Sequence, residues 1–178
     1  MDKYMLLNNL RNIPDFPIPG IQFKDVSTLF KNAACLQEML NELESLYKDK
    51  GITKIVGVES RGFMLAAALA DRLKCGFVMC RKHGKLPGEV LTEEYDKEYG
   101  KDRIEIHVGA IEENDVVLIH DDILATGGSI MAAYNLVNKF HPRKTMVNFI
   151  IELKCEGLAG GKLLEQNHVD YTTLLTIE

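Results

Sequence analysis

The sequence predicts an α/β fold in which a central, mostly parallel sheet is flanked by helices. Short apolar runs alternate along the chain with stretches of helical periodicity, which is the pattern of strands joined by crossover helices. The run at 116–119 is continuously apolar, as in a strand buried on both faces of a parallel sheet. Because 178 residues suit one domain of ordinary size, we expect a single domain over 1–178.

The first part of the chain is expected to begin with a short helix over 2–11. Three prolines then fall between 14 and 19, where they fix φ and remove backbone donors, so a helix cannot continue. We expect this stretch to form a rigid excursion outside the main fold. Apolar residues recur with helical spacing over 33–50, which predicts an amphipathic helix that ends at Gly51.

The remaining elements are expected to alternate between strands and helices. The pattern predicts strands at 55–58, 77–80, 104–108, 116–119, 145–151 and 169–177, and helices at 62–73, 129–140 and 157–165. Between them, 82–102 has no sustained periodicity and carries many charges, so we expect a long surface loop with at most short strands. A loop of that length inside a compact domain is usually functional or disordered.

Composition and charge exclude several classes of protein. The formal net charge of −5 argues against a nucleic-acid partner, because such proteins are usually basic. No apolar run approaches the roughly 18 residues of a membrane span, and the first residues lack the basic and apolar regions of a signal peptide. Without a CxxC pair, the four scattered cysteines indicate a reduced cytoplasmic protein. They are Cys35, Cys75, Cys80 and Cys155.

The most informative motif follows the predicted strand at 116–119. Two acidic residues, Asp121 and Asp122, come first, and a short loop then leads into Thr126-Gly127-Gly128-Ser129 at the start of a helix. Ligands of open α/β sheets bind at the carboxyl ends of strands, and a helix N-terminus offers amide donors to an anion. Glycine lets the backbone approach closely, and the threonine and serine add hydroxyl donors. The motif therefore predicts a phosphate-binding loop over 125–129.

The two carboxylates narrow the class of ligand. They would repel a phosphate, but they can accept hydrogen bonds from sugar hydroxyls and favour positive charge that develops on a sugar ring. Ribose 5-phosphate combines hydroxyls with a phosphate in this way. The alternative phosphate motifs, G-x-x-x-x-G-K-[ST] and G-x-G-x-x-G, do not occur in the chain.

This segment resembles the phosphoribosyl pyrophosphate loop of the type I phosphoribosyltransferases. Three further segments, 16–25, 59–63 and 81–88 together with 98–101, resemble the adenine-specific branch of that family and occur in family order. The resemblance covers nearly the whole chain. It implies the type I phosphoribosyltransferase fold, with a small N-terminal hood at about 12–28 over the base and a flexible lid loop at about 82–103.

The resemblance also implies an activity. We expect Mg²⁺-dependent transfer of the phosphoribosyl group of phosphoribosyl pyrophosphate (PRPP) to adenine, giving AMP and pyrophosphate in purine salvage. The family expectation is a homodimer, and the resemblance leaves open which basic residue acts across its interface. Because magnesium keeps waters and uses few protein ligands, we expect the substrate to hold it, with Asp121 or Asp122 touching it through water.

The PRPP ligands implied by the resemblance surround three loops. Arg61 opens a helix after a strand and is expected to bind pyrophosphate, while the cations that follow the strand at 77–80 can neutralise the leaving group. The family usually has aspartate in place of Glu59 and often arginine in place of His83, which receives no role. The expected ligands are Glu59, Ser60, Arg61, Arg81, Lys82, Lys85, Tyr99, Asp121, Asp122, Ala125, Thr126, Gly127, Gly128 and Ser129.

The adenine site is implied by the hood and the lid. Phe23 and Ile123 are expected to stack on the two faces of the purine, with backbone groups around Gln22 and Lys24 reading its edge. The family commonly has arginine in place of Lys24, so a guanidinium role does not carry over. Glu98 matches the glutamate that acts on adenine as a general acid or base, and the lid that carries it would exclude water.

Two alternatives remain open. A phosphoribosyltransferase for another purine, such as hypoxanthine or xanthine, would share the phosphate loop and differ in the hood. A nucleotide-sensing regulator on the same fold would need a surface or domain for nucleic acid, for which an acidic chain of 178 residues leaves little room.

Overall fold

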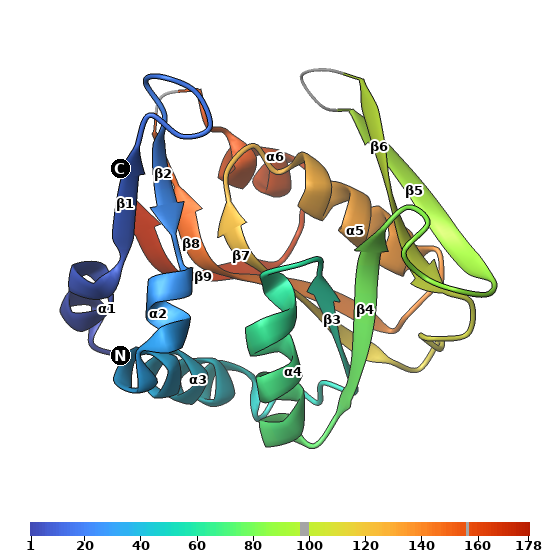
Figure 1. Ribbon diagram of the computed structural model, residues 1–178. Helices are drawn as coiled ribbons and strands as arrows, with labels where there is room; N and C mark the ends of the chain where they lie inside the picture. The colour runs from blue at the N-terminus through green and yellow to red at the C-terminus, as the bar shows by residue number, and fades with distance from the viewer. Residues whose placement is uncertain (97–99, 156) are drawn as a thin grey trace. The chain divides into compact units, whose positions relative to one another are not determined.

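The computed structural model describes residues 1–96, 100–155 and 157–178 (Figure 1). These residues fall into two units, Met1–Leu46 and Tyr47–Glu178, and the second contains the main sheet. No helix in the described ranges is long and apolar enough to cross a membrane.

The N-terminal unit is built on a two-stranded antiparallel sheet. Its elements are α1 (Lys3–Asn9), β1 (Arg11–Pro14), β2 (Gln22–Asp25), α2 (Ser27–Lys31) and α3 (Ala33–Tyr47), the last of which reaches the second unit. The predicted helix over 2–11 is too long, because Arg11 already belongs to β1 and pairs with Asp25 of β2 in the strand register and as an ion pair. This guanidinium lowers the pKa of the Asp25 carboxyl to about 2.

The second unit is built on one large sheet, which confirms the predicted α/β class. In the described part of the chain it has seven strands in the order β5-β6-β4-β3-β7-β8-β9. The strands from β4 through β9 in this order run parallel, while β6 runs antiparallel to both β4 and β5. The bounds are β3 (Lys54–Val58), β4 (Gly76–Lys82), β5 (Val90–Asp96), β6 (Lys101–His107), β7 (Val116–Leu124), β8 (Lys144–Leu153) and β9 (Tyr171–Ile177).

The helices α4 (Gly62–Leu73) and α5 (Gly128–Asn138) cover opposite faces of this sheet (Figure 1). Val56 and Val58 of β3 belong to the core cluster that includes the buried side of α5. Gly57 lies between them and faces Phe63 and Ala66 of α4. Successive residues of a strand point to opposite faces, so β3 is buried on both sides as the parallel arrangement requires.

Two regions contain much more strand than predicted. The predicted strand at 116–119 continues as β7 to Leu124, because Asp121 and Ile123 keep their backbone register with β8. The stretch 82–102 was expected to be mainly loop, but β5 and the start of β6 occupy much of it. None of the seven residues of β5 is buried, and only Leu91 and Tyr95 pack partly buried against the core, with Glu93 between them, so the strand shows no regular alternation in the sequence.

A row of hydrogen-bonded polar side chains, called here the polar ladder, runs across the sheet from β7 to β9. His120, Asn148 and Thr172 are direct cross-strand partners on β7, β8 and β9. The Asn148 Nδ2 donates to Thr172 Oγ1 at 2.9 Å, which turns its Oδ1 toward His120 Nδ1, also at 2.9 Å. The imidazole therefore carries its proton on Nδ1. Beyond Thr172, the Tyr47 hydroxyl lies 2.6 Å from the threonine Oγ1 and completes the ladder.

Candidate active site

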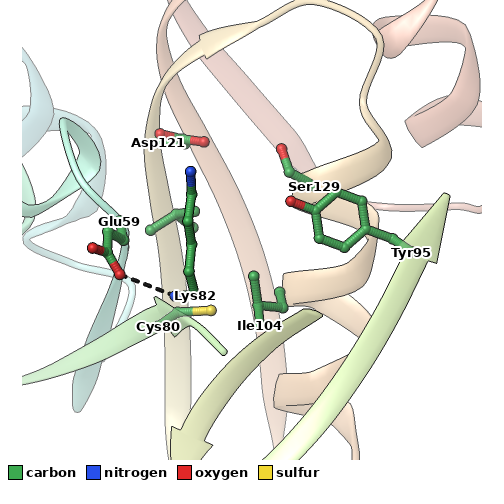
Figure 2. Close-up of a pocket in the computed structure, with 8 residues that line it drawn as sticks. Glu59, Cys80, Lys82, Tyr95, Ile104, Asp121 and Ser129 are labelled. Atoms are coloured by element: carbon green, nitrogen blue, oxygen red, sulfur yellow. Dashed lines mark hydrogen bonds between the residues drawn. The ribbon is translucent and has the colours of Figure 1, made fainter. Parts of the chain in front are cut away.

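A cavity of about 180 Å³ opens at the carboxyl edge of the parallel strands (Figure 2). Val58 ends β3, Lys82 ends β4, and Asp121 lies in the last part of β7. Because parallel strands share this edge, polar residues that follow separate strands meet there. The lining residues are Val58, Glu59, Cys80, Lys82, Tyr95, Ile104, Asp121 and Ser129.

The predicted phosphate loop joins β7 to α5 on one side of this cavity. Gly127 is the N-cap of α5 and has φ +86°, a left-handed conformation that favours glycine. The helix begins at Gly128, and the Ser129 side chain lines the cavity. Since the first amides of a helix have no intrahelical acceptors, the loop presents N–H donors and the positive end of the α5 dipole. Ala125 and Thr126 lie in the same loop.

The two acidic residues of the motif have different partners. Asp121 lines the cavity, and its Oδ1 accepts from the Asp122 backbone N–H at 2.8 Å. Asp122 is buried and forms an ion pair with Arg61. Burial and the charge of Asp122 raise the pKa of the Asp121 carboxyl well above its ordinary value. One carboxylate thus faces the cavity, while the other holds the residue that precedes α4.

The loop after β3 and the end of β4 are held together by Glu59. Its carboxylate accepts from Arg81 Nε and Nη2, each at 3.1 Å, and from the Lys82 backbone N–H at 2.9 Å. Hydrogen bonding to Arg81 lowers the pKa of the Glu59 carboxyl. Arg81 Nη1 also donates to the Lys85 carbonyl at 3.2 Å. The Arg81 guanidinium therefore braces the loop that carries Lys85.

The cations of the site differ in their surroundings. Figure 2 shows the Lys82 side chain extending through the cavity toward Asp121, while its backbone stays tied to Glu59. Ser60 and Arg61 connect β3 to α4, and Arg61 is the residue at the N-cap of that helix. The structure thus brings Glu59, Lys82 and Asp121 into one cavity, while Arg61 pairs with Asp122, the residue next to Asp121.

Sequence reasoning missed several residues of this region. Tyr95 lines the cavity from β5, where a loop was expected, and Ile104 lines it from β6, at the start of the strand predicted at 104–108. Glu105 is buried and accepts from the Gly84 backbone N–H at 3.0 Å, and its carboxylate also binds His83 Nδ1. Simple alternation with Ile104 and Ile106 would place Glu105 on the exposed face. A buried acid next to a basic segment gives no local signal in the sequence.

The residues expected to bind adenine lie in both units. Gln22, Phe23 and Lys24 are on β2 of the N-terminal unit, where the Gln22 and Lys24 side chains both bond to Asn12, at 2.6 and 3.0 Å. Phe23 makes an edge-to-face contact with Phe16, with ring centroids 5.2 Å apart. Ile123 is on β7 of the second unit.

Two further residues of the expected site, Glu98 and Tyr99, lie outside the described residues. Their roles therefore stay predictions.

The donor set can be compared with what a divalent cation requires. Among the described residues, no three His, Cys, Asp or Glu side chains gather into a group that could hold a metal ion. The cavity lining carries two carboxylates, that of Glu59, which Arg81 engages, and that of Asp121, and this small set suits a magnesium ion that is held mainly by substrate oxygens and water.

The sequence of this chain is similar to a known protein family and to characterised members of it. A family model described as a phosphoribosyl transferase domain matches residues 25–171. The adenine phosphoribosyltransferase of Phocaeicola vulgatus is 59% identical over 177 residues, which cover 99% of this chain and 100% of that protein.

Solved structures give the same picture. The adenine phosphoribosyltransferase of Rhodothermus marinus matches with a TM-score of 0.89 and 45% identity, covering 98% of this chain and 97% of that one. The Giardia lamblia enzyme in complex with 9-deazaadenine matches with a TM-score of 0.92 and 38% identity, covering 100% of this chain and 99% of that one.

Proposed function

This chain belongs to the adenine phosphoribosyltransferase family, and we infer that it transfers the phosphoribosyl group of PRPP to adenine, forming AMP and pyrophosphate in purine salvage. The observation that carries this function is the cavity at the carboxyl edge of the sheet, where Asp121, Lys82 and Ser129 converge from β7, β4 and α5. A sugar phosphate needs hydroxyl acceptors beside phosphate donors, and this cavity offers both.

The phosphate loop binds the 5′-phosphate of the substrate. The amides of 126–129 and the hydroxyls of Thr126 and Ser129 donate to its oxygens, and the α5 dipole favours its charge. This loop fixes one end of the ribose, so the anomeric carbon is held in a defined place relative to β7. Such positioning contributes to the rate because the reacting groups are already oriented.

The carboxylates of β7 act on the ribose. Asp121 accepts hydrogen bonds from ribose hydroxyls in the cavity, and its negative charge favours the positive charge that develops on the ring in an oxocarbenium-like transition state. Asp122 holds Arg61 next to the loop after β3. The displacement forms the bond between the anomeric carbon and an adenine nitrogen and breaks the bond to the pyrophosphate oxygen.

The leaving pyrophosphate is received by the loop after β3 and by the basic segment at 81–85. Arg61, Lys82 and Lys85 supply the positive charge, and Glu59 and Ser60 shape the loop between them. Magnesium, when bound, would offset the negative charge of the leaving group. Asp121 would contact this ion through water.

The N-terminal hood holds adenine, and a glutamate of the lid transfers a proton to or from it. Phe23 and Ile123 stack on the base, backbone groups of Gln22 and Lys24 read its edge, and Glu98 acts as its general acid or base. Tyr99 binds PRPP. These roles rest on the family membership.

We also infer that the protein is a cytoplasmic homodimer. Met64 of α4 and Phe77 and Met79 of β4 are exposed apolar residues, and the Phe77 ring contacts that of Phe63, so these two elements present apolar surface to solvent. A second copy that covers this surface would lie beside Arg81, two residues after Met79 on the same face of β4. All four cysteines are free thiols, which supports a reducing compartment.

The direct test is AMP formation from adenine, PRPP and Mg²⁺ by the purified protein, with hypoxanthine and xanthine as competing bases. We expect turnover with adenine and little with the other two bases. Faster turnover with hypoxanthine than with adenine would overturn the assignment of the base. Binding to DNA or RNA without formation of AMP would instead favour a regulatory role on the same fold.

A further inference from the structure

The predicted phosphate loop rests on the first turn of α6 (Gly160–Gln166), which lies more than thirty residues further along the chain. The Gly160 backbone N–H donates to the Ala125 carbonyl oxygen at 2.9 Å. Both segments belong to the second unit. The loop that receives the phosphate is therefore tied to a helix that contributes no residue to the cavity lining.

The contact is made directly between two backbones. A Cβ at Gly160 would lie 2.5 Å from the Ala125 carbonyl oxygen and 2.7 Å from Leu124 Cδ1. From the other side, a Cβ at Gly127 would lie 3.0 Å from Gly160 Cα. Carbon atoms do not approach oxygen or carbon this closely, so a side chain at 160 would have to push the backbone of the loop away from α6.

We propose that Gly160 is a positioning residue for the 5′-phosphate, because its lack of a side chain sets how closely the loop at 125–128 can sit against α6. This inference rests on the proposed function. The loop binds through backbone amides, so its donors move with the backbone and have no rotamer with which to compensate. Restoring an ordinary contact at Gly160 requires a shift of about 1 Å, enough to cost an oriented reaction much of its rate.

The neighbouring glycine provides a matched control. A Cβ at Gly161 would lie 2.2 Å from Glu152 Oε1 and 2.9 Å from the Tyr171 hydroxyl. Both atoms are side-chain ends on β8 and β9, and neither belongs to the phosphate loop. The same added methyl group in the same helical turn therefore presses on the loop at 160 and on other side chains at 161.

The experiment compares Gly160→Ala with Gly161→Ala. It measures kcat, the KM for PRPP, the KM for adenine, the thermal midpoint, and the Kd for ribose 5-phosphate by calorimetry. For Gly160→Ala we expect the KM for PRPP and the Kd for ribose 5-phosphate to rise at least about tenfold, with the KM for adenine within about twofold of the wild type. For Gly161→Ala we expect both PRPP and ribose 5-phosphate values within about twofold, whatever its thermal midpoint.

Three outcomes would overturn the proposal: unchanged PRPP and ribose 5-phosphate values in Gly160→Ala, equal effects in the two variants, or an equal rise in both KM values. If Gly160→Ala does not fold, Leu163→Ala takes its place, since this side chain packs beside Gly127 and its removal adds no atom. We then expect the KM for PRPP to rise about threefold, and no change would overturn the proposal.

The wild-type protein separates this proposal from the proposed function. If it binds ribose 5-phosphate but forms no AMP, the function fails, and the two glycine variants still test the positioning through the Kd alone. If it forms AMP and Gly160→Ala behaves as the wild type, the function stands and the positioning role fails.

Discussion

The phosphate loop at 125–129 and the basic segment at 81–85 both lie where an anion is expected, but the protein prepares them in different ways. The loop offers backbone amides at the start of α5, and their geometry depends on Gly127 and on the contact with Gly160. The basic segment offers side-chain cations, and its Arg81 is already bound to Glu59. Backbone donors need close packing behind them, whereas side-chain cations need carboxylates that hold them in place.

The phosphate loop and the basic segment should bind an anion in different ways. Backbone amides at a helix start carry no formal charge and can receive a phosphate without exchanging partners. The guanidinium of Arg81 and the backbone of Lys82 share the Glu59 carboxylate. Substitutions in the loop should therefore act through backbone geometry, and substitutions around the basic segment should act through the placement of charge.

The largest expected effect comes from changing the loop backbone. Gly127→Ala puts a side chain at φ +86° and against Gly160, so the amides of the loop should lose their alignment. We expect kcat/KM for PRPP to fall between about a hundredfold and a thousandfold, the range for loss of oriented donors in an active site. Steady-state kinetics at saturating adenine measures this change.

Gly109→Ala is the matched control for that substitution. Gly109 also has positive φ, +76°, but a Cβ there would meet nothing within 4 Å. It should show the same kind of backbone strain with kcat/KM near the wild-type value. A comparable loss of activity in the two variants would mean that strain alone, without the position in the loop, explains the effect.

A smaller effect is expected from the carboxylate that holds the basic segment. Glu59→Gln removes the negative charge that orients Arg81 while a side chain of similar shape remains; in the wild type the hydrogen bonds from Arg81 lower the pKa of the Glu59 carboxyl. We expect kcat/KM for PRPP to fall about tenfold because the leaving group meets misplaced cations. Glu113→Gln, at an exposed position outside the site, is the control. An unchanged Glu59→Gln enzyme would show that the segment needs no carboxylate to hold it.

The smallest effect on catalysis at neutral pH is expected from His120, whose influence falls on acid stability. Burial lowers its pKa from 6.5 to about 4, while Asn148 and the nearby Asp122 partly oppose the shift. Between these two pH values the unfolded chain therefore binds a proton at His120, whereas the folded protein keeps this side chain neutral. The contribution of the neutral His120 to the free energy of unfolding should be fully present above about pH 6.5. It should fall by up to about 3 kcal/mol as the pH drops toward 4.

His120→Gln removes this titration and tests the assignment. Denaturant unfolding at several pH values should show a smaller loss of stability between pH 6.5 and 4 in the variant than in the wild type. The loss linked to Asp25, whose pKa is about 2, begins at lower pH and should remain in both proteins. Identical pH profiles above pH 4 would mean that His120 does not resist protonation.

The phosphate loop and the basic segment also differ in how much of each could be predicted from the sequence. The phosphate loop was predicted because all its parts are neighbours along the chain: an apolar strand, two acids, a short loop and a helix start. The α/β class and the mostly parallel sheet were confirmed for the same reason, since each apolar run signals its own strand. The bracing of Arg81 by Glu59 joins residues 22 positions apart and has no such signal.

By itself, the amino-acid sequence determined the alternation of strands and helices from β3 to β9, apart from β5, and the segments that carry the phosphate-binding and acidic residues. Only the tertiary structure decided that Asp121 faces the cavity while Asp122 pairs with Arg61, that Glu105 is buried beneath His83, and that α6 supports the loop. Local patterns record which residues favour a strand or a helix start. Which residue pairs with a buried charge, or packs against a backbone at a glycine, is set by contacts between segments that are distant in the sequence. No local or periodic pattern in the sequence indicates such contacts.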